Sequence, residues 1–206
     1  MPSLDICILD YGSGNVKSVF NILKHLGHEA VISNQKSAIK NSSHLILPGV
    51  GAFGSAMEKI HNKIPLDCLE DQVLSCGKPF LGICVGMQVL ADEGNEFKKT
   101  EGLGWISGSV NKLESNNLPL PHVGWNDLIV DKSSNIFDKL KDHKDFYFVH
   151  SYVFDVQNNQ NILAYSDYGS NFVSVVNKDN IFGFQFHPEK SQRAGQLMIN
   201  NFLKQN

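Results

Sequence analysis

Two short runs of the sequence carry residues that could do nucleophilic chemistry together. Cys84 lies between two glycines in the run Gly82-Ile83-Cys84-Val85-Gly86, and the run His187-Pro188-Glu189 lies near the C-terminus. Flanking glycines permit a tight turn that presents the thiol, and they leave room for a substrate to approach it. A histidine held by a carboxylate is the partner that such a nucleophile needs. The pair of runs therefore predicts covalent catalysis by a cysteine.

The elements around these residues are expected to position them. The apolar run 78–83 predicts a buried strand, and a helix is expected to start at Cys84 and to end at about residue 92. The N-terminal end of that helix would favour thiolate over thiol. His187 follows the predicted strand 181–186, at the edge of a parallel sheet where catalytic groups gather. Pro188 restricts His187 to an extended backbone, and Glu189 can then reach the far nitrogen of the ring.

A glycine-rich segment, Pro48-Gly49-Val50-Gly51, could supply backbone N–H donors to a negatively charged oxygen. An acyl-transfer enzyme needs such donors, and the N–H of Val85 is the natural second one because it follows the nucleophile. A Pro-Gly-x-Gly run alone more often forms a simple turn. Together with Cys84, His187 and Glu189, however, it completes a set of nucleophile, base, orienting group and oxyanion donors.

The order of apolar runs predicts an α/β fold. Strand-like runs at 4–9, 30–33, 44–47 and 78–83 alternate with helical stretches at 16–26, 55–61 and 66–75. This alternation predicts a parallel sheet with right-handed crossovers and helices on both faces. After residue 94 the pattern predicts further strands, several of them antiparallel, at 105–113, 125–130, 146–149, 162–165, 172–177 and 181–186. A last helix is expected at 191–203, and we expect residues 1–206 to form one domain.

Composition excludes several functional classes. The chain has 206 residues and a net charge of −3, which gives no reason to expect binding to nucleic acid or to an anionic membrane. The N-terminus lacks a signal-peptide pattern and no run is long enough to span a bilayer, so we expect a cytoplasmic protein. The cysteines form no C-x-x-C pair and have no histidine at zinc-finger spacing, which predicts free thiols and no metal site. They are Cys7, Cys68, Cys76 and Cys84.

The loop Gly12-Ser13-Gly14 does not predict a nucleotide cofactor. The third glycine of a dinucleotide-binding G-x-G-x-x-G motif is replaced by Lys17, and the chain has no Walker A run. We interpret this loop as the start of a helix, with the cap at residues 13–15.

The motifs at 82–88 and 187–189, Gly-x-Cys-x-Gly-x-Gln and His-Pro-Glu, resemble those of the class I (triad) glutamine amidotransferases. Within that class, five more segments resemble the glutaminase subunits of imidazole glycerol phosphate synthases; these segments are 11–15, 48–53, 121–126, 147–152 and 186–191. The resemblance covers essentially the whole chain. It implies a three-layer, flavodoxin-like sandwich with a central, mostly parallel sheet and added antiparallel strands.

The resemblance also implies a reaction. Cys84 would attack the side-chain amide of glutamine, with the oxyanion held by the Val85 N–H and by the strand Gly49-Val50-Gly51. His187 would protonate the departing ammonia, Glu189 would support the imidazolium, and water would hydrolyse the γ-glutamyl thioester to glutamate. No cofactor is implied.

The same resemblance implies further contacts. Gln88 matches the family position that contacts glutamine. Trp125, Tyr147 and Lys190 match motifs that lie toward a partner, a (β/α)8-barrel cyclase subunit that forms a heterodimer and uses the ammonia in histidine biosynthesis. For Trp125, a place in the apolar core is the alternative.

Three other interpretations remain open at this point. The segments 102–106 and 190–195 are similar to a paralogous branch that supplies ammonia to enzymes modifying surface-polysaccharide or nonulosonic sugars, which leaves the acceptor open. A scaffold protein with a dead site is a second interpretation, against which the intact Cys84, His187 and Glu189 argue. A cysteine peptidase of similar fold is a third, but such enzymes usually place the histidine close after the nucleophile. Here Val85 follows Cys84, and the distant His-Pro-Glu run favours the amidotransferase.

Overall fold

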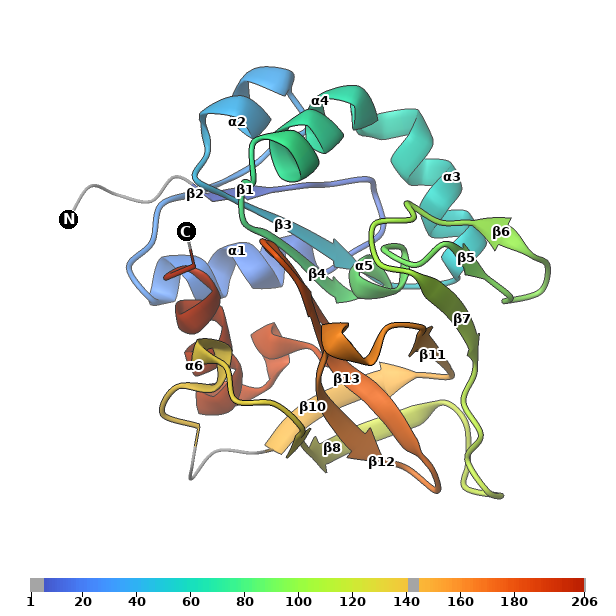
Figure 1. The fold of residues 1–206 in the computed structure, drawn as a ribbon. Helices are drawn as coiled ribbons and strands as arrows, with labels where there is room; N and C mark the ends of the chain where they lie inside the picture. The colour runs from blue at the N-terminus through green and yellow to red at the C-terminus, as the bar shows by residue number, and fades with distance from the viewer. Residues whose placement is uncertain (1–5, 141–144, 206) are drawn as a thin grey trace.

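The centre of the molecule is a mixed sheet covered by helices on both faces (Figure 1). The computed structural model describes residues 6–140 and 145–205. The strand order is β2 (Ala30–Ile32), β1 (Ile6–Ile8), β3 (His44–Gly49), β4 (Phe80–Cys84), β14 (Ile181–Phe184), β13 (Asn171–Lys178), β12 (Ile162–Asp167) and β9 (Ile129–Val130). The strands from β2 to β14 are parallel, and β13, β12 and β9 extend the sheet in antiparallel fashion. The predicted α/β class is confirmed.

The helices form the two outer layers of the sandwich. On one face lie α2 (Lys36–Asn41), α3 (Phe53–Lys63) and α4 (Leu66–Glu70), and on the other lie α1 (Val16–His25) and α6 (Gln192–Phe202) (Figure 1). A π-helix, η1 (Asp71–Ser75), continues α4 directly. Helix α1 is amphipathic: its buried residues Val19 and Leu23 are four apart and so share one face.

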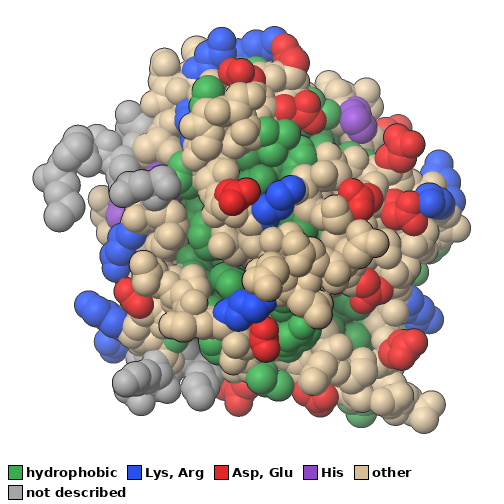
Figure 2. All heavy atoms as spheres, viewed as in Figure 1, with side chains coloured by type: hydrophobic (Ala, Val, Ile, Leu, Met, Phe, Trp, Pro, Cys, Tyr) green, Lys and Arg blue, Asp and Glu red, His purple; other side chains and the backbone are tan. Residues whose placement is uncertain are grey.

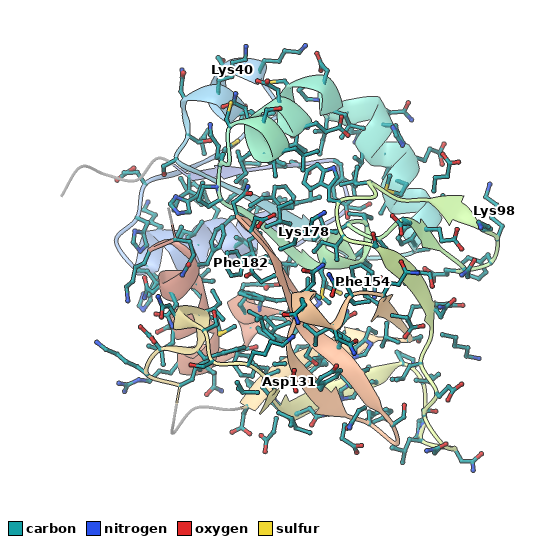
Figure 3. The ribbon with its side chains drawn as sticks, viewed as in Figure 1. Lys40, Lys98, Asp131, Phe154, Lys178 and Phe182 are labelled. Atoms are coloured by element: carbon teal, nitrogen blue, oxygen red, sulfur yellow. The ribbon has the colours of Figure 1, made fainter. Side chains whose placement is uncertain are left out.

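The inner parallel strands are largely apolar because both of their faces are covered, whereas the edge strand β2 leaves Val31 partly exposed. Ile6 and Ile8 of β1 and Leu45 of β3 are fully buried. Burial of each such side chain contributes about 1.5–3 kcal/mol. On the α6 side, Phe182 of β14 (Figure 3) packs edge-on against Phe202, with 5.9 Å between the ring centroids. This packing makes the strand ends rigid supports for the loops that follow them.

Two smaller sheets extend the fold beyond the central one (Figure 1). The first is four-stranded, in the order β11 (Tyr152–Val156), β7 (Gly108–Lys112), β5 (Glu93–Gly94) and β6 (Thr100–Glu101). The second pairs β10 (Asp145–His150) with β8 (His122–Asp127). Short helical turns complete the described elements: α5 (Val85–Gln88), η2 (Asn135–Phe137), η3 (Asn159–Asn161) and η4 (Pro188–Lys190).

The helix expected to run from Cys84 to residue 92 is wrong in length, because α5 ends at Gln88. The next backbone carbonyls bond outside the helix. The Val89 carbonyl accepts from the Leu103 N–H at 2.8 Å, and the Leu90 carbonyl accepts from the Trp105 N–H at 2.9 Å. Tertiary bonds to the loop 102–106 therefore replace the continuation of the helix.

Other differences concern short or polar elements. Strand β3 does not stop at Leu47 but continues through Pro48 and Gly49, which pair with Ile83 and Cys84. The sequence pattern also missed α2, β5, β6 and β11. Helix α2 buries a single residue, Ile39, so it carries almost no periodic signal.

The visible face of the molecule carries charges of both signs (Figure 2). On the face shown in Figure 2, acidic and basic side chains are interspersed rather than gathered by sign. No helix in the described parts of the chain is both long enough and apolar enough to cross a membrane.

Candidate active site

Cys84 occupies a strained turn between a strand and a helix. It is the last residue of β4 and the N-cap of α5, with φ 55° and ψ −113°. Residues other than glycine rarely adopt a positive φ, and this backbone conformation costs on the order of 1–3 kcal/mol. Gly86 makes the turn possible, because a Cβ there would lie 1.9 Å from the Leu47 carbonyl oxygen. Since α5 has only one turn, its dipole is weaker than that of the long helix expected from the sequence.

His187 and Glu189 form a buried pair. The His187 Nδ1 lies 2.9 Å from the Glu189 Oε1, and the two side chains are 4% and 0% exposed. The backbone of His187 is extended, with φ −97° and ψ 94°, as expected before proline. Strand β14 ends at Phe184, so His187 is held instead by its N–H, which donates to the Tyr147 carbonyl at 2.9 Å.

The His187 ring also faces the thiol of Cys84. Burial alone disfavours the imidazolium, but hydrogen bonds and charge interactions with Cys84 and Glu189 outweigh it and raise the pKa of His187 to about 10. Because Nδ1 is committed to Glu189, the nitrogen that faces the sulfur is Nε2. The structure thus brings Cys84, His187 and Glu189 into one line, with an imidazole that favours its charged form between two acidic groups.

Asn15 supports this line from the other side, and the motif analysis did not identify it as a site residue. Its Nδ2 donates to the Glu189 Oε1 at 3.1 Å, and its Oδ1 accepts from the Ser18 hydroxyl at 3.0 Å. Among the described residues, the Glu189 Oε2 is buried without a partner, so Oε1 carries both polar contacts of the carboxylate. Asn15 lies in the loop that follows β1, at the carboxyl edge of the sheet. That position could have identified it as a site residue from the sequence.

The contacts predict a graded loss of activity among these residues. We expect His187→Asn to cost the most, because it removes the proton carrier, and Glu189→Gln to cost on the order of 10²-fold less. Asn15→Ala is expected to lower kcat about 10-fold, the effect of losing one hydrogen bond to a charged group. Release of glutamate from glutamine, the reaction that the sequence resemblance implies, is measured for each variant and checks the order. A Glu189→Gln enzyme more impaired than His187→Asn would reverse the assigned roles.

The predicted oxyanion segment lies beside the nucleophile. Gly49 pairs with Cys84 across β3 and β4. Val50 and Gly51 line the same pocket as Cys84 and Val85. Gly51 has φ +94°, a conformation that favours glycine, and Val50 is 41% exposed. All four predicted donor residues are therefore next to Cys84.

A cavity of about 460 Å³ opens beside Cys84, which is a suitable size for an amino-acid substrate. Gln88 lines it, and both N–H groups of its amide are committed: Nε2 donates to the Tyr152 carbonyl at 2.9 Å and to the Gln185 Oε1 at 3.0 Å. The Gln88 oxygen is therefore the atom of this amide that remains available to the substrate, and it can accept a hydrogen bond.

Two charged side chains also line the cavity, Glu96 and Lys190. They could pair with the ammonium and carboxylate groups of an amino acid. The sequence analysis missed Glu96, which lies in a polar segment without a motif. The structure anchors its carboxylate on the backbone N–H of Phe53, at 2.8 Å.

The three residues predicted to face a partner form one cluster at the edge of the cavity. Trp125 of β8 and Tyr147 of β10 are directly paired, with 5.8 Å between their ring centroids. The Lys190 Nζ lies 5.5 Å from the Tyr147 ring, a cation–π geometry. Trp125 is 48% exposed, so the alternative of a core aromatic is wrong.

The remaining cysteines and the acidic side chains form no second centre in the part of the chain that the structure describes. There, no group of three or more His, Cys, Asp or Glu side chains is arranged to hold a metal ion. Cys7, Cys68, Cys76 and Cys84 are all free thiols.

Comparison with known proteins identifies the family. The model of the class-I glutamine amidotransferases matches residues 7–206. The chain is 44% identical to imidazole glycerol phosphate synthase subunit HisH 2 of Vibrio vulnificus, covering 97% of this chain and 94% of that protein. It is 43% identical to subunit HisH of Pelagibacter ubique, covering 97% and 99%.

Solved structures support the same fold. A crystal structure of a glutamine amidotransferase superposes with a TM-score of 0.72 at 21% identity, covering 97% of both chains. PurLQS of Thermotoga maritima superposes with a TM-score of 0.72 at 20% identity, covering 98% of both chains. With the family model matching nearly the whole chain, this protein belongs to the class-I glutamine amidotransferases.

Proposed function

We propose that this chain is the glutaminase subunit of an imidazole glycerol phosphate synthase. The observation that carries the proposal is the buried line of Cys84, His187 and Glu189 beside a cavity of amino-acid size. The chain also shares 44% and 43% identity, over nearly its full length, with two HisH subunits. We take residues 1–206 as one domain. This domain would hydrolyse glutamine to glutamate and ammonia.

The geometry supports a two-step mechanism. The Cys84 sulfur attacks the side-chain carbonyl carbon of glutamine, and the negative charge develops on the oxygen next to the Val85 N–H and the segment Gly49–Gly51. His187 gives the proton on Nε2 to the nitrogen, the C–N bond breaks and ammonia leaves. Water then attacks the thioester and passes a proton to His187. The C–S bond breaks, which releases glutamate and regenerates the thiolate.

The side chains that line the cavity account for the binding of an amino acid as the substrate. Glu96 and Lys190 offer opposite charges for the α-ammonium and α-carboxylate groups, and the Gln88 oxygen offers an acceptor to an N–H of the substrate. Glu189 supports the imidazolium through Nδ1, so the proton that moves is always on Nε2.

We assign the cluster of Trp125, Tyr147 and Lys190 to the interface with a (β/α)8-barrel cyclase subunit. Lys190 lines the cavity, and the half-exposed indole of Trp125 is the kind of amphipathic side chain that protein interfaces favour. In a heterodimer formed there, ammonia would pass from the cavity to the partner without entering the solvent. Free thiols at all four cysteines fit a reducing cytoplasm.

Growth of a histidine auxotroph that lacks its own HisH subunit tests the assignment. We expect the wild-type chain, expressed with its own cyclase subunit, to restore growth without histidine, and we expect Cys84→Ala to fail on low ammonium. Failure of the wild-type pair, together with glutaminase activity in the presence of a sugar-modifying synthase, would contradict the histidine assignment. That result would favour the paralogous branch.

A further inference from the structure

Gln185 is a buried amide that touches the nucleophile and has no part in the two-step mechanism. It follows the end of β14 and is 0% exposed. Its backbone N–H donates to the Ser174 carbonyl at 2.9 Å, which holds the residue on the sheet. Its side-chain Nε2 lies 3.8 Å from the Cys84 Sγ, within hydrogen-bonding distance for sulfur. A polar side chain buried this completely needs its partners, because a buried donor left without an acceptor has lost its bonds to water without replacing them.

The direction of this hydrogen bond follows from the neighbouring bonds. The Tyr152 carbonyl can only accept, so the atom of Gln88 that lies 2.9 Å from it must be the nitrogen. The same nitrogen lies 3.0 Å from Gln185, so the Gln185 atom that it contacts must be the oxygen. The other terminal atom of Gln185, which faces Cys84, is therefore the N–H donor. A backbone carbonyl thus sets the orientation of both amides and aims an N–H group at the sulfur.

A donor in this position acts on the thiolate more than on the thiol. A neutral thiol is a weak acceptor, whereas hydrogen bonds to a charged group are roughly twice as strong as those between neutral groups. The charged sulfur occurs twice in the cycle, before attack on glutamine and again when the C–S bond breaks and its electron pair returns to sulfur. The N–H group therefore raises the population of thiolate available for attack, and it stabilises the charge that returns to sulfur when the C–S bond breaks.

We propose that Gln185 is a further catalytic residue, which stabilises the Cys84 thiolate, and that Gln88 is the positioning residue that keeps its N–H aimed at the sulfur. The inference rests on the proposed function, since it takes Cys84 as the nucleophile. It gives Gln88 a second task besides facing the substrate, and it links the substrate cavity to the nucleophile through two side-chain amides.

Alkylation of Cys84 by iodoacetamide tests the proposal without glutamine or a partner. In this reaction the thiolate forms an S–C bond and iodide leaves, so the rate rises with the fraction of Cys84 that is present as thiolate. We expect Gln185→Met, which keeps the length of the side chain and removes the donor, to slow alkylation of Cys84 by about 10-fold. Gln185→Glu is expected to slow it further, because a carboxylate would face the sulfur.

Controls in the same samples separate chemistry from damage to the fold. Mass spectrometry of the Cys84 and Cys76 peptides gives both rates at once, and the exposed Cys76 is expected to react equally in all variants. Ser174→Ala removes a buried hydrogen bond between Ser174 of β13 and Ser166 of the neighbouring strand β12. This variant is expected to leave the alkylation rate of Cys84 unchanged. Gln88→Met, which removes the positioning group alone, is expected to slow alkylation less than Gln185→Met.

Equal Cys84 alkylation rates in wild type and Gln185→Met would overturn the proposal, as would equal slowing by Gln185→Met and Ser174→Ala. If Gln185→Met does not fold, as judged by circular dichroism, the Gln88→Met rate decides: no slowing in that variant overturns the proposal. Absence of glutamine hydrolysis by the wild-type complex would instead contradict the proposed function, and the alkylation rates would still stand as measured.

Discussion

Cys84→Ala is expected to abolish glutamine-dependent turnover by the complex, because no γ-glutamyl thioester can form without the sulfur. Loss of a nucleophile of this kind lowers kcat on the order of 10⁶-fold, which is below detection in most assays. The fold is expected to survive, since the change removes one atom at the end of β4 and leaves the packing of Gly86 against Leu47 intact. Coupled measurement of glutamate release and of cyclase product checks both halves of the reaction.

Free ammonia provides the control for this variant. Supplied to the Cys84→Ala complex, it is expected to restore product formation at the cyclase, because the damaged step is bypassed. Glutamate release from glutamine at a rate near that of wild type would refute the assignment of the nucleophile.

The isolated chain is expected to hydrolyse glutamine very slowly, and the cyclase partner with its bound acceptor is expected to stimulate it by about 10²–10³-fold, the effect of gaining one oxyanion donor. The segment Gly49–Gly51 gives the physical reason. Two glycines let a peptide plane rotate between presenting an N–H and presenting a C=O group to the site. Val50 is 41% exposed, so this stretch is open to a surface that a partner can reach.

Glutamate release with and without purified partner decides this prediction. Cys84→Ala, which removes the nucleophile, serves as the control for hydrolysis that does not involve the site. Full activity of the isolated chain would rule out a partner-driven switch and would leave the roles of Cys84, His187 and Glu189 unaffected.

The fold was largely predictable because its core strands are strong local signals. The apolar residues 45–47 and 80–83 of the predicted strands 44–47 and 78–83 lie in buried parallel strands, since both faces of those strands are covered. The predictions failed where tertiary contacts override local pattern. Helix α5 ends at Gln88 because the following carbonyls bond the loop 102–106, and no propensity in residues 85–92 reports that loop.

The site residues also fall into a group that the sequence predicts and a group that only the fold reveals. Cys84 and His187 were recognisable because their motifs also shape the backbone around them. Asn15, Glu96 and Gln185 were not, because each acts through a contact with a residue far away in the sequence. Asparagine, glutamate and glutamine are common on any surface, and only the fold shows that Asn15 contacts Glu189, that Glu96 lines the cavity and that Gln185 contacts Cys84. Trp125 was undecided for the same reason, and its exposed fraction settled the question.

Labelling with a diazoketone analogue of glutamine tests the central claim most directly. The analogue occupies the substrate cavity, His187 donates a proton to the diazo carbon, and the Cys84 sulfur then displaces dinitrogen to form a stable carbon–sulfur bond. After incubation of the complex with one equivalent, we predict that peptide mapping finds the adduct on Cys84 alone, that excess glutamine prevents it, and that His187→Asn strongly slows it. An adduct on Cys7, Cys68 or Cys76 instead, or an unlabelled Cys84 in an active complex, would contradict the account.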